Sequence, residues 1–541
     1  MIFFLNATMQ PQKSGIEHAQ LKRADLFRAH GERFKIVLRE WDPLLHENIK
    51  ATSLKSFEVI NMFDYFQEAT EVSDQTITVD NLDFGGANTH RVEELKKNRY
   101  LIYDINQQLI ARVNYRTDQK QVASTELFDG FGNLYCVNMY DSRGFVSLSQ
   151  WYTPDNKIGS ETWQSPEGRT VLEAFNKINS DGSVEKVCWR LMSRVGEIHI
   201  FDTLEQVTLH FLNLLNDEYW SKNEPNIFIL DRAHLAQTVL RYLDKPSYNV
   251  LFLHNSHASD ASHPEKGILN NNYEYSLFNI NVYDAVVSAT ERQTNDIRSR
   301  FKPTTKLFTI PVGVIPMKQL QQQRVPMAER TFGKVVALAR KAPEKQLDQL
   351  VKAVAYARQQ VPQITLDLYG YKDPTNNFLA ERLIESAIRE NNLENIVTLH
   401  DYTNQVALVE QDAQVFGVTS SMEGFNLSLM EALAQGDIGV TYDVNYGPNA
   451  IINEGKNGYI VPLNDYKSMG EALIHIFKEP RLMQQLSDTS YEMSYRYSSD
   501  TVWAQWCLLL VDAKKMWPVK QANYFHMTIN DLKGADEESE S

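Results

Sequence analysis

The stretch VFGVTSSMEGFNLSLMEALAQG, residues 415–436, predicts a strand, a turn and a helix in direct succession. The short apolar run at its start fits a buried strand, and its second half has the apolar content of a packed helix. Gly424 permits a tight turn between the two elements, and Asn426 or Ser428 can cap the helix. A buried strand that leads directly into a helix is typical of an α/β protein with a parallel sheet.

The same succession recurs on both sides of this stretch. Five more strand patterns are each followed by a helical pattern: KVVALAR (334–340), ITLDLYG (364–370), IVTLHDY (396–402), IGVTYD (438–443) and GYIVPL (458–463). We therefore expect a doubly wound α/β domain over residues 316–490. C-terminal helices over residues 491–530 are expected to pack back on the N-terminal domain, and a disordered acidic tail over residues 531–541 follows.

A second α/β series occupies the N-terminal half. The strands IFFL (2–5) and FKIVL (34–38) flank the helical pattern IEHAQLKRADLFRAHG (16–31). The alternation resumes near residue 200 with a helix, a strand, a helix and a strand: EQVTLHFLNLLNDEYW (205–220), NIFILD (226–231), AHLAQTVLRYL (233–243) and NVLFLHNSH (249–257). We assign residues 1–59 and 196–315 to this N-terminal Rossmann-like domain. Two doubly wound sheets in one chain usually meet at a cleft that binds a ligand.

Between the two parts of the N-terminal domain, alternating apolar and polar residues are interrupted by frequent turns. The turn motifs DGFG, DSRG, PDN, PEG and SDG begin at Asp129, Asp141, Pro154, Pro166 and Ser180. Successive turns lie about 12 to 14 residues apart, which is the spacing of an antiparallel β-meander. We therefore expect an antiparallel β-rich insertion over residues 60–195. A purely structural appendage is one interpretation of it, but such a sheet more often serves assembly or binds a large partner.

The composition excludes several classes of protein. A net charge of −15 disfavours a general nucleic-acid binder. Cys136, Cys188 and Cys507 lie far apart without a CxxC pair, so we expect neither a disulfide framework nor a zinc site. The opening MIFFLNATMQ lacks the basic region of a signal peptide, and no apolar run is long enough for a transmembrane helix. We expect a cytoplasmic protein, at most peripherally bound to the inner face of the membrane.

Two carboxylates, Glu423 and Glu431, bracket the apolar residues of the opening stretch. On one helix their separation would leave them about 80° apart, at about 3.6 residues per turn. With Glu423 in the turn and Glu431 on the helix, both could reach one ligand at the helix N-terminus, where free N–H groups suit a phosphate. Exposed glutamates on an amphipathic helix are the commoner explanation of such spacing, so the pair alone does not establish a site.

Further motifs place these glutamates in a wider pattern. LFTIPVGV (307–314), VALARKAPEKQLDQLVKA (336–353), LDLYG (366–370), EGFNLSLMEALAQG (423–436) and YGPNAIINEGKNGYIVPL (446–463) follow one another in this order. Together they resemble the retaining, nucleotide-sugar-dependent GT-B glycosyltransferases of the large family that includes glycogen-synthase-like and sucrose-synthase-like enzymes. The resemblance covers about residues 200–500 and the loop KSGIEHAQ (13–20). It implies an α/β fold of two Rossmann-like domains that face a cleft.

The resemblance implies roles for charged residues at the predicted cleft. A departing nucleoside diphosphate carries negative charge that fixed cations stabilise. Arg340 and Lys345 would bind the diphosphate, while Glu423 would bind hydroxyls of the transferred sugar and Glu431 those of the ribose. For Lys345 alone, a solvated loop lysine is the alternative. The other donor-binding residues that the resemblance implies are Ser14, Gly15, Asn404, Gly424, Phe425, Asn426, Leu427, Tyr446, Gly447 and Pro448.

The resemblance also implies a histidine near the reacting sugar. We choose His257, which completes a catalytic set with Arg340, Lys345 and Glu423; His254, on the acceptor side, is the alternative. For either histidine, a core position with a hydrogen bond to the backbone is the rival interpretation. No cluster of Asp, His or Cys has the spacing of metal ligands, so we expect no metal and no cofactor besides a UDP-glucose or UDP-N-acetylglucosamine donor. Same-face transfer assisted by a donor phosphate oxygen and double displacement through a carboxylate both stay open.

The inserted sheet, together with SGIEHAQLKR (14–23), is similar to that of two bacterial groups. One group comprises the wall teichoic acid α-glycosyltransferases, which act on poly(glycerol phosphate) or poly(ribitol phosphate). The other adds N-acetylglucosamine to serine-rich adhesins before their export. We favour poly(glycerol phosphate) because basic residues begin the insertion of an acidic protein: Lys96, Lys97, Arg99, Arg112 and Arg116.

Other interpretations of the insertion stay open. A solvated face of mixed charge explains the basic residues as well, because Glu93 and Glu94 are their neighbours. The resemblance implies a homo-oligomer or a partner subunit held through the insertion. A third hypothesis is an inactive paralogue that binds glycan or acts as a chaperone. The presence of all four predicted donor-site charges opposes it: Arg340, Lys345, Glu423 and Glu431.

Overall fold

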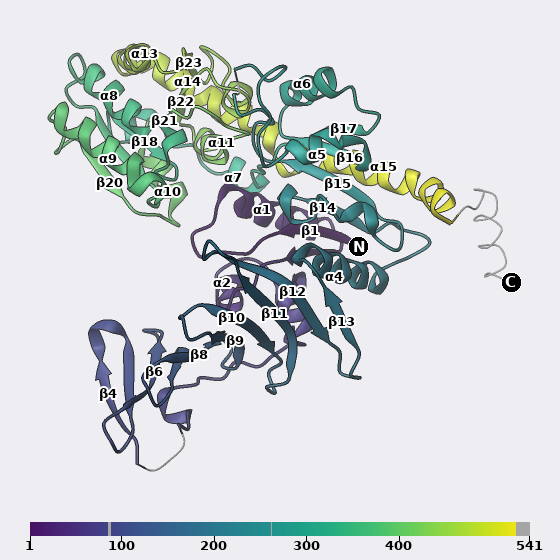
Figure 1. Ribbon diagram of the computed structural model, residues 1–541. Coiled ribbons are helices and arrows are strands. Elements are labelled where there is room, and N and C mark those ends of the chain that lie inside the picture. Colours follow the sequence, from purple (N-terminus) through teal and green to yellow (C-terminus); the bar gives the residue numbers. More distant parts are fainter. Residues whose placement is uncertain (85–87, 261, 526–541) are drawn as a thin grey trace. The chain divides into compact units, whose positions relative to one another are not determined.

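The computed structural model describes residues 1–84, 88–260 and 262–525, in two compact units (Figure 1). The first unit comprises residues 1–11 and 33–247, and the second comprises residues 12–32 and the chain from residue 248 onward. The predicted acidic tail, residues 531–541, lies outside the described residues. The six predicted domain ranges stay a prediction.

Four parallel strands form the α/β part of the first unit, in the order β14-β1-β2-β3. Their bounds are Ile227–Leu230, Ile2–Asn6, Phe34–Leu38 and Val59–Asn61. All residues of β1 and β14 are buried, as expected of central parallel strands covered on both faces. Phe3 and Phe228 stack across the pair with ring centroids 4.7 Å apart. The helices of this unit are α2 (Leu45–Lys50), α3 (Met62–Phe66) and α4 (Leu204–Glu218).

The β-rich insertion is one ten-stranded antiparallel sheet in which neighbours in the chain are neighbours in space (Figure 1). Its strands are β4 (His90–Glu94), β5 (Arg99–Tyr103), β6 (Leu109–Tyr115), β7 (Val122–Phe128), β8 (Leu134–Tyr140), β9 (Val146–Tyr152), β10 (Ile158–Gln164), β11 (Thr170–Ile178), β12 (Val184–Met192) and β13 (Ile198–Phe201). Gly132, Gly144, Gly168 and Gly182 adopt positive φ in the predicted turns, where glycine is the least strained residue. The meander inferred from turn spacing is therefore present.

One predicted helix is wrong. AHLAQTVLRYL, residues 233–243, contains only two 3₁₀ turns, Ala233–Leu235 and Leu240–Tyr242. Ala236 ends the first turn with a φ of −146°, which lies outside the helical region. Most apolar side chains of the segment are buried. Their packing in the core therefore determines the backbone conformation and overrides the helical pattern of the sequence.

The second unit contains two sets of parallel strands. β15 (Tyr248–Leu253), β16 (Ala285–Ser288) and β17 (Lys306–Thr309) form the first, with α1 (Gly15–Ala29), α5 (Glu274–Phe278), α6 (Glu291–Phe301) and the long α15 (Ser499–Phe525) beside them (Figure 1). Trp506 of α15 joins this set to α1, because its ring lies 5.2 Å from that of Phe27 and 5.9 Å from that of Phe252. The segment of residues 12–32 thus packs with the C-terminal part of the chain.

The second set is a six-stranded sheet in the order β20-β19-β18-β21-β22-β23. The strands are β18 (Lys334–Leu338), β19 (Thr365–Tyr369), β20 (Val397–His400), β21 (Val415–Val418), β22 (Ile438–Tyr442) and β23 (Gly458–Val461). The helices that follow them are α8 (Leu347–Arg358), α9 (Thr375–Glu390), α10 (Val406–Asp412), α11 (Leu427–Ala434), α12 (Gly447–Ile451) and α13 (Tyr466–Lys478), and α14 (Pro480–Met493) comes after α13.

The strand order of this sheet reverses between β18 and β21. From β18 the chain runs outward through β19 and β20, and from β21 it runs the opposite way through β22 and β23. The loops that leave adjacent strands at such a switch point diverge, and the opening between them is where doubly wound sheets bind ligands. None of the helices in the described residues is both long and apolar enough to span a membrane.

Candidate functional site

An ion pair joins the two loops at the switch point of the six-stranded sheet. Lys345, in the loop after β18, places its Nζ 2.8 Å from Oε1 of Glu423, in the loop after β21. The same oxygen accepts hydrogen bonds from Ser420 Oγ at 2.7 Å and Asn426 Nδ2 at 3.0 Å. Glu423 is only 7% exposed. A cation and two dipoles therefore compensate the burial of this carboxylate.

Asn426 is the residue that caps α11, so the sequence alternative Ser428 is not used. The Asn426 side chain accepts a hydrogen bond from Leu429 N at 2.9 Å and donates to Glu423. Its φ of 78° is left-handed, a conformation that asparagine tolerates better than most residues. One side chain therefore fixes both the start of the helix and the orientation of the carboxylate.

Glu431, about one turn into α11, pairs with a residue that the sequence analysis missed. Lys22 of α1 places its Nζ 2.7 Å from Glu431 Oε1. Burial lowers the pKa of Lys22, but the charge of Glu431 and their hydrogen bond outweigh it, so the pKa lies above its ordinary value. The helical spacing of Ser14, His18 and Lys22 along one face of α1 could have indicated this contact.

A second buried acid lies close to this pair. Glu410 of α10 is 1% exposed, and its Oε1 has no hydrogen-bond partner in the described residues. Burial and the charges of Glu431 and Asp437 raise the pKa of Glu410 well above its ordinary value. Glu410 therefore holds a proton more strongly in the folded protein than an exposed glutamate does.

Arg340 shortly precedes Lys345 in the chain, but its guanidinium already forms ion pairs with two carboxylates. Its guanidinium is 2.5 Å from Glu344 and 3.0 Å from Asp373, and 42% of its side chain is exposed. Binding a diphosphate would require exchange of at least one of these carboxylates for a phosphate oxygen. A half-exposed guanidinium with five donors can make that exchange at low cost.

The Tyr446–Pro448 turn lies against the Glu423–Phe425 turn. Tyr446 N donates to Glu423 O at 2.8 Å, and α12 begins at the next residue. A Cβ on Gly447 would lie 1.7 Å from Phe425 O, so only glycine permits this approach of two backbones. The structure thus brings Glu423, Gly424, Phe425, Tyr446 and Gly447 together.

The two histidines have different environments. His257 is fully buried, its Nε2 lies 3.1 Å from Pro264 O, and its Nδ1 lies 3.4 Å from the Tyr446 hydroxyl. Burial lowers the pKa of His257 to about 4. His254 is half-buried, and a Cβ on Gly424 would lie 2.2 Å from its carbonyl oxygen. The geometry favours His254 as the histidine next to the Glu423 turn.

At the start of α1, Ser14 forms a capping box with Glu17. Ser14 N donates to Glu17 Oε2 at 2.7 Å, and Ile16 N donates to Ser14 Oγ at 3.3 Å. A Cβ on Gly15 would meet nothing within 4 Å. Asn404 is exposed in the loop after β20, two residues beyond Tyr402, whose hydroxyl lies 3.2 Å from the His18 ring. The predicted phosphate and base contacts of Ser14, Gly15 and Asn404 stay predictions.

The basic residues of the insertion are largely neutralised. Lys97 and Arg99 pair with Glu94 at 3.5 and 2.5 Å, and Arg112 pairs with Glu126 at 2.8 Å. Arg116 donates to the backbone of Val122 and Tyr140, while Lys96 lies exposed in the 3₁₀ turn Leu95–Lys97. The face therefore carries mixed charge, which removes the observation on which the teichoic acid preference depended.

No group of three or more His, Cys, Asp or Glu side chains in residues 1–84, 88–260 and 262–525 is arranged to hold a metal ion. The metal-free donor site stays a prediction from the residue pattern.

Comparison with known proteins shows what the chain resembles. Residues 321–493 match the model of the glycosyl transferases group 1 family. The pneumococcal O-GlcNAc transferase GtfA, solved in complex with UDP and GlcNAc, superposes with a TM-score of 0.78 at 23% identity, over 95% of this chain and 98% of that one. The chain therefore has the GT-B fold, with two parallel sheets and a ten-stranded antiparallel insertion in its N-terminal part.

Two curated relatives connect the chain to both bacterial groups. It is 27% identical over 532 residues to the UDP-N-acetylglucosamine–peptide N-acetylglucosaminyltransferase GtfA subunit of Streptococcus gordonii, covering 95% of this chain and 99% of the relative. It is 27% identical over 423 residues to the poly(glycerol-phosphate) α-glucosyltransferase of Bacillus subtilis strain 168, covering 77% of this chain and 58% of the relative. The resemblance to group 1 glycosyltransferases with an inserted antiparallel sheet is confirmed.

Proposed function

We propose that this protein is a retaining glycosyltransferase that moves N-acetylglucosamine from its UDP donor to serine and threonine hydroxyls of a protein. The observation that carries the proposal is the Lys345–Glu423 ion pair at the switch point, with α11 starting beside it. The pair places a fixed cation and a hydrogen-bond acceptor at the position where doubly wound sheets bind nucleotides. An inactive paralogue would not need to keep this pair.

The charges of the site suit a nucleotide-sugar donor. Lys345 and Arg340 would stabilise the negative charge that builds on UDP as the glycosidic bond breaks. Glu423, held by Lys345, Ser420 and Asn426, would accept hydrogen bonds from hydroxyls of the sugar. Since its Oε1 already accepts three hydrogen bonds, we assign Glu423 to binding and not to nucleophilic attack. This assignment favours same-face transfer over double displacement.

Glu431 and Lys22 would complete the nucleotide end of the site. Two ribose hydroxyls are donors, and a carboxylate is an acceptor that can take both of them. Lys22 holds the Glu431 carboxylate in one orientation. We therefore assign Glu431 to ribose binding and Lys22 to its positioning.

Two observations favour a protein acceptor over teichoic acid. The chain is 27% identical to the GtfA relative and spans 99% of it, whereas it spans 58% of the poly(glycerol-phosphate) transferase. It spans 98% of the poly(ribitol-phosphate) α-N-acetylglucosaminyltransferase of Staphylococcus aureus strain COL, but at 21% identity. Acidic neighbours pair with much of the basic start of the insertion, so it offers little free charge to a polyphosphate. As the relative is a GtfA subunit, we further propose that the insertion holds a partner subunit or a second copy, and that the protein acts in the cytoplasm, where nucleotide sugars occur.

A labelled-sugar assay tests the acceptor. Purified protein is incubated with radiolabelled UDP-N-acetylglucosamine or UDP-glucose, together with an unfolded serine-rich polypeptide or poly(glycerol phosphate). The proposal predicts label from UDP-N-acetylglucosamine in the polypeptide. Label that enters only poly(glycerol phosphate), from UDP-glucose, would establish the teichoic acid alternative instead. UDP release without label in either polymer would keep the donor site and reject both acceptors.

A further inference from the structure

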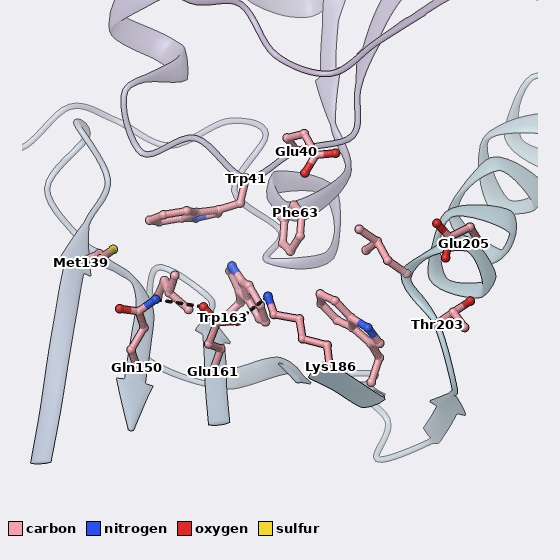
Figure 2. A pocket seen from close by; sticks show the side chains of 13 residues that line it. Glu40, Trp41, Phe63, Met139, Gln150, Glu161, Trp163, Lys186, Thr203 and Glu205 are labelled. Carbon is pink, nitrogen blue, oxygen red and sulfur yellow. Dashed lines mark hydrogen bonds and ion pairs between the residues drawn. The ribbon is translucent and has the colours of Figure 1, made fainter. Parts of the chain in front are cut away.

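A pocket of about 500 Å³ lies within the first unit, and none of the residues assigned to the donor lines it (Figure 2). Strands β8, β9, β10 and β12 form one wall, and the other wall comes from the segment after β2, from α3 and from the start of α4. Its volume falls in the range of small-molecule sites, roughly 300–1,000 Å³. Neither the motifs of the sequence nor the donor site accounts for it.

Aromatic rings dominate the lining of this pocket. Trp163 and Trp189 stack with centroids 5.5 Å apart, and Phe63 lies 5.0 Å from Trp163. Trp41, whose Nε1 donates to Ser147 Oγ at 2.9 Å, lies across the pocket from Glu161 and Lys186 (Figure 2). The hydrogen bond fixes the Trp41 indole, which presents a rigid apolar face to an occupant.

One donor of the lining lacks a partner. Trp163 is 3% exposed, and its Nε1 is buried without a hydrogen-bond acceptor in the part of the chain that the structure describes. Buried indole N–H groups usually have a partner. An occupant with a hydroxyl or carbonyl oxygen would supply the missing acceptor.

The charges around the pocket exclude two kinds of occupant. Glu40, Glu161 and Glu205 line it together with a single cation, Lys186, which disfavours a phosphate polymer. A quaternary ammonium group would suit the aromatic rings. However, Lys186 Nζ already lies 5.6 Å from the ring centroid of Trp163 and 5.1 Å from that of Trp189. Lys186 also pairs with Glu161, so this side chain already occupies the position that a ligand cation would take.

We propose that this pocket is a saccharide-binding site that takes one neutral pyranose residue. The apolar face of the ring would pack on Trp41, and a hydroxyl or N-acetyl oxygen would accept the hydrogen bond of Trp163 Nε1. Gln150 and Glu161, which are hydrogen-bonded to each other at 2.9 Å, offer polar contacts to further hydroxyls. The sugar comes either as a free saccharide or as a residue already attached to the acceptor; the second source rests on the proposed function.

Saturation-transfer NMR on the full-length protein without nucleotide tests the site. The probes are N-acetylglucosamine, an N-acetylglucosamine-bearing serine peptide, the bare peptide, choline and inorganic phosphate. We expect saturable binding of both sugar probes, with the glycopeptide tighter if the attached sugar is the natural source. Binding of choline or phosphate without binding of sugar would overturn the proposal.

Variants separate this pocket from the donor site. Trp41→Ala and Gln150→Ala should weaken sugar binding at least tenfold, whereas Glu423→Gln should leave it unchanged. Trp151→Ala is the matched control, because Trp151 is on β9, 45% exposed and outside the pocket. Equal sugar affinity in the parent and in both pocket variants would overturn the proposal, and melting temperatures show that each variant is folded. UDP release from UDP-N-acetylglucosamine is measured with the same proteins. This release tests the proposed function independently of sugar binding in the pocket.

Discussion

Lys345 and Glu423 form an ion pair of 2.8 Å that joins the loops after two adjacent parallel strands, β18 and β21. Glu423 is buried, and Ser420 and Asn426 donate to the same oxygen that Lys345 approaches. The pair has a structural and a chemical consequence, because it holds two loops together and places a cation at the expected diphosphate position.

Lys345→Ala should reduce the rate of UDP-sugar turnover by about 10²- to 10³-fold, the usual effect of removing one group that stabilises developing charge. It should also lower the melting temperature, since Glu423 would remain buried without its cation. Arg389→Ala, which breaks the exposed pair with Glu385 on the surface of α9, is the control and should change neither quantity much. Turnover at the parental rate in the folded Lys345 variant would contradict the site.

Glu431→Gln should weaken UDP binding by about 10- to 100-fold, because hydrogen bonds to a charged group contribute about 1.5–3 kcal/mol. Lys22→Met should weaken it by a smaller factor, and the double variant should resemble Glu431→Gln alone if Lys22 acts through Glu431. Isothermal titration with UDP measures all three. Additive effects of the two substitutions would show that Lys22 acts on the nucleotide by another route.

Glu410 should make stability depend on pH. Its pKa is raised in the folded protein above the ordinary value of 4.5, so the folded state keeps a proton that the unfolded state loses. The stability present below about pH 4.5 is therefore lost as the pH rises towards the raised pKa. Glu410→Gln should remove this loss, so its melting temperature should exceed the parent's by a margin that grows from pH 5 to pH 8.

Thermal unfolding at several pH values measures this margin. Glu385→Gln, on the exposed surface of α9, is the control and should show no such trend. A margin that is constant or shrinks with rising pH would contradict a buried, protonated Glu410.

His254→Ala should lower the turnover rate without a change in melting temperature, whereas His257→Ala should lower the melting temperature. The reason is that His257 is fully buried and contacts Pro264 O and Tyr446, while His254 is half-buried beside the Gly424 turn. The rate of UDP-sugar turnover and the melting temperature from differential scanning fluorimetry distinguish the two variants. A large loss of turnover in a His257 variant of parental stability would restore the choice made from the sequence.

Much of the fold follows from short-range patterns. The β-meander was predictable because glycine turns at Gly132, Gly144 and Gly168 require residues that accept positive φ. The strand–turn–helix unit around Gly424 was predictable because a short apolar run leads into a helix that Asn426 can cap. The AHLAQTVLRYL segment was not, since Ala236 leaves the helical region where the surrounding core determines the backbone.

The candidate site was only partly predictable. The sequence motifs indicated Lys345 and Glu423, but their ion pair depends on the order of strands in the sheet, which no local pattern encodes. Lys22 and Glu431 meet for a similar reason. The basic character of the insertion was overestimated because Arg112 lies opposite Glu126 on the neighbouring strand, and a count of charges along the chain does not show cross-strand partners.

The most direct test of the proposed function is the proton NMR spectrum of the product formed from UDP-N-acetylglucosamine and a serine-rich polypeptide. We predict one new anomeric signal with the small coupling of an α-linked N-acetylglucosamine on serine or threonine, present with the parent protein and absent with Glu423→Gln. A β-linked product, or equal product from the parent and the Glu423 variant, would contradict a retaining transferase built on the Lys345–Glu423 pair.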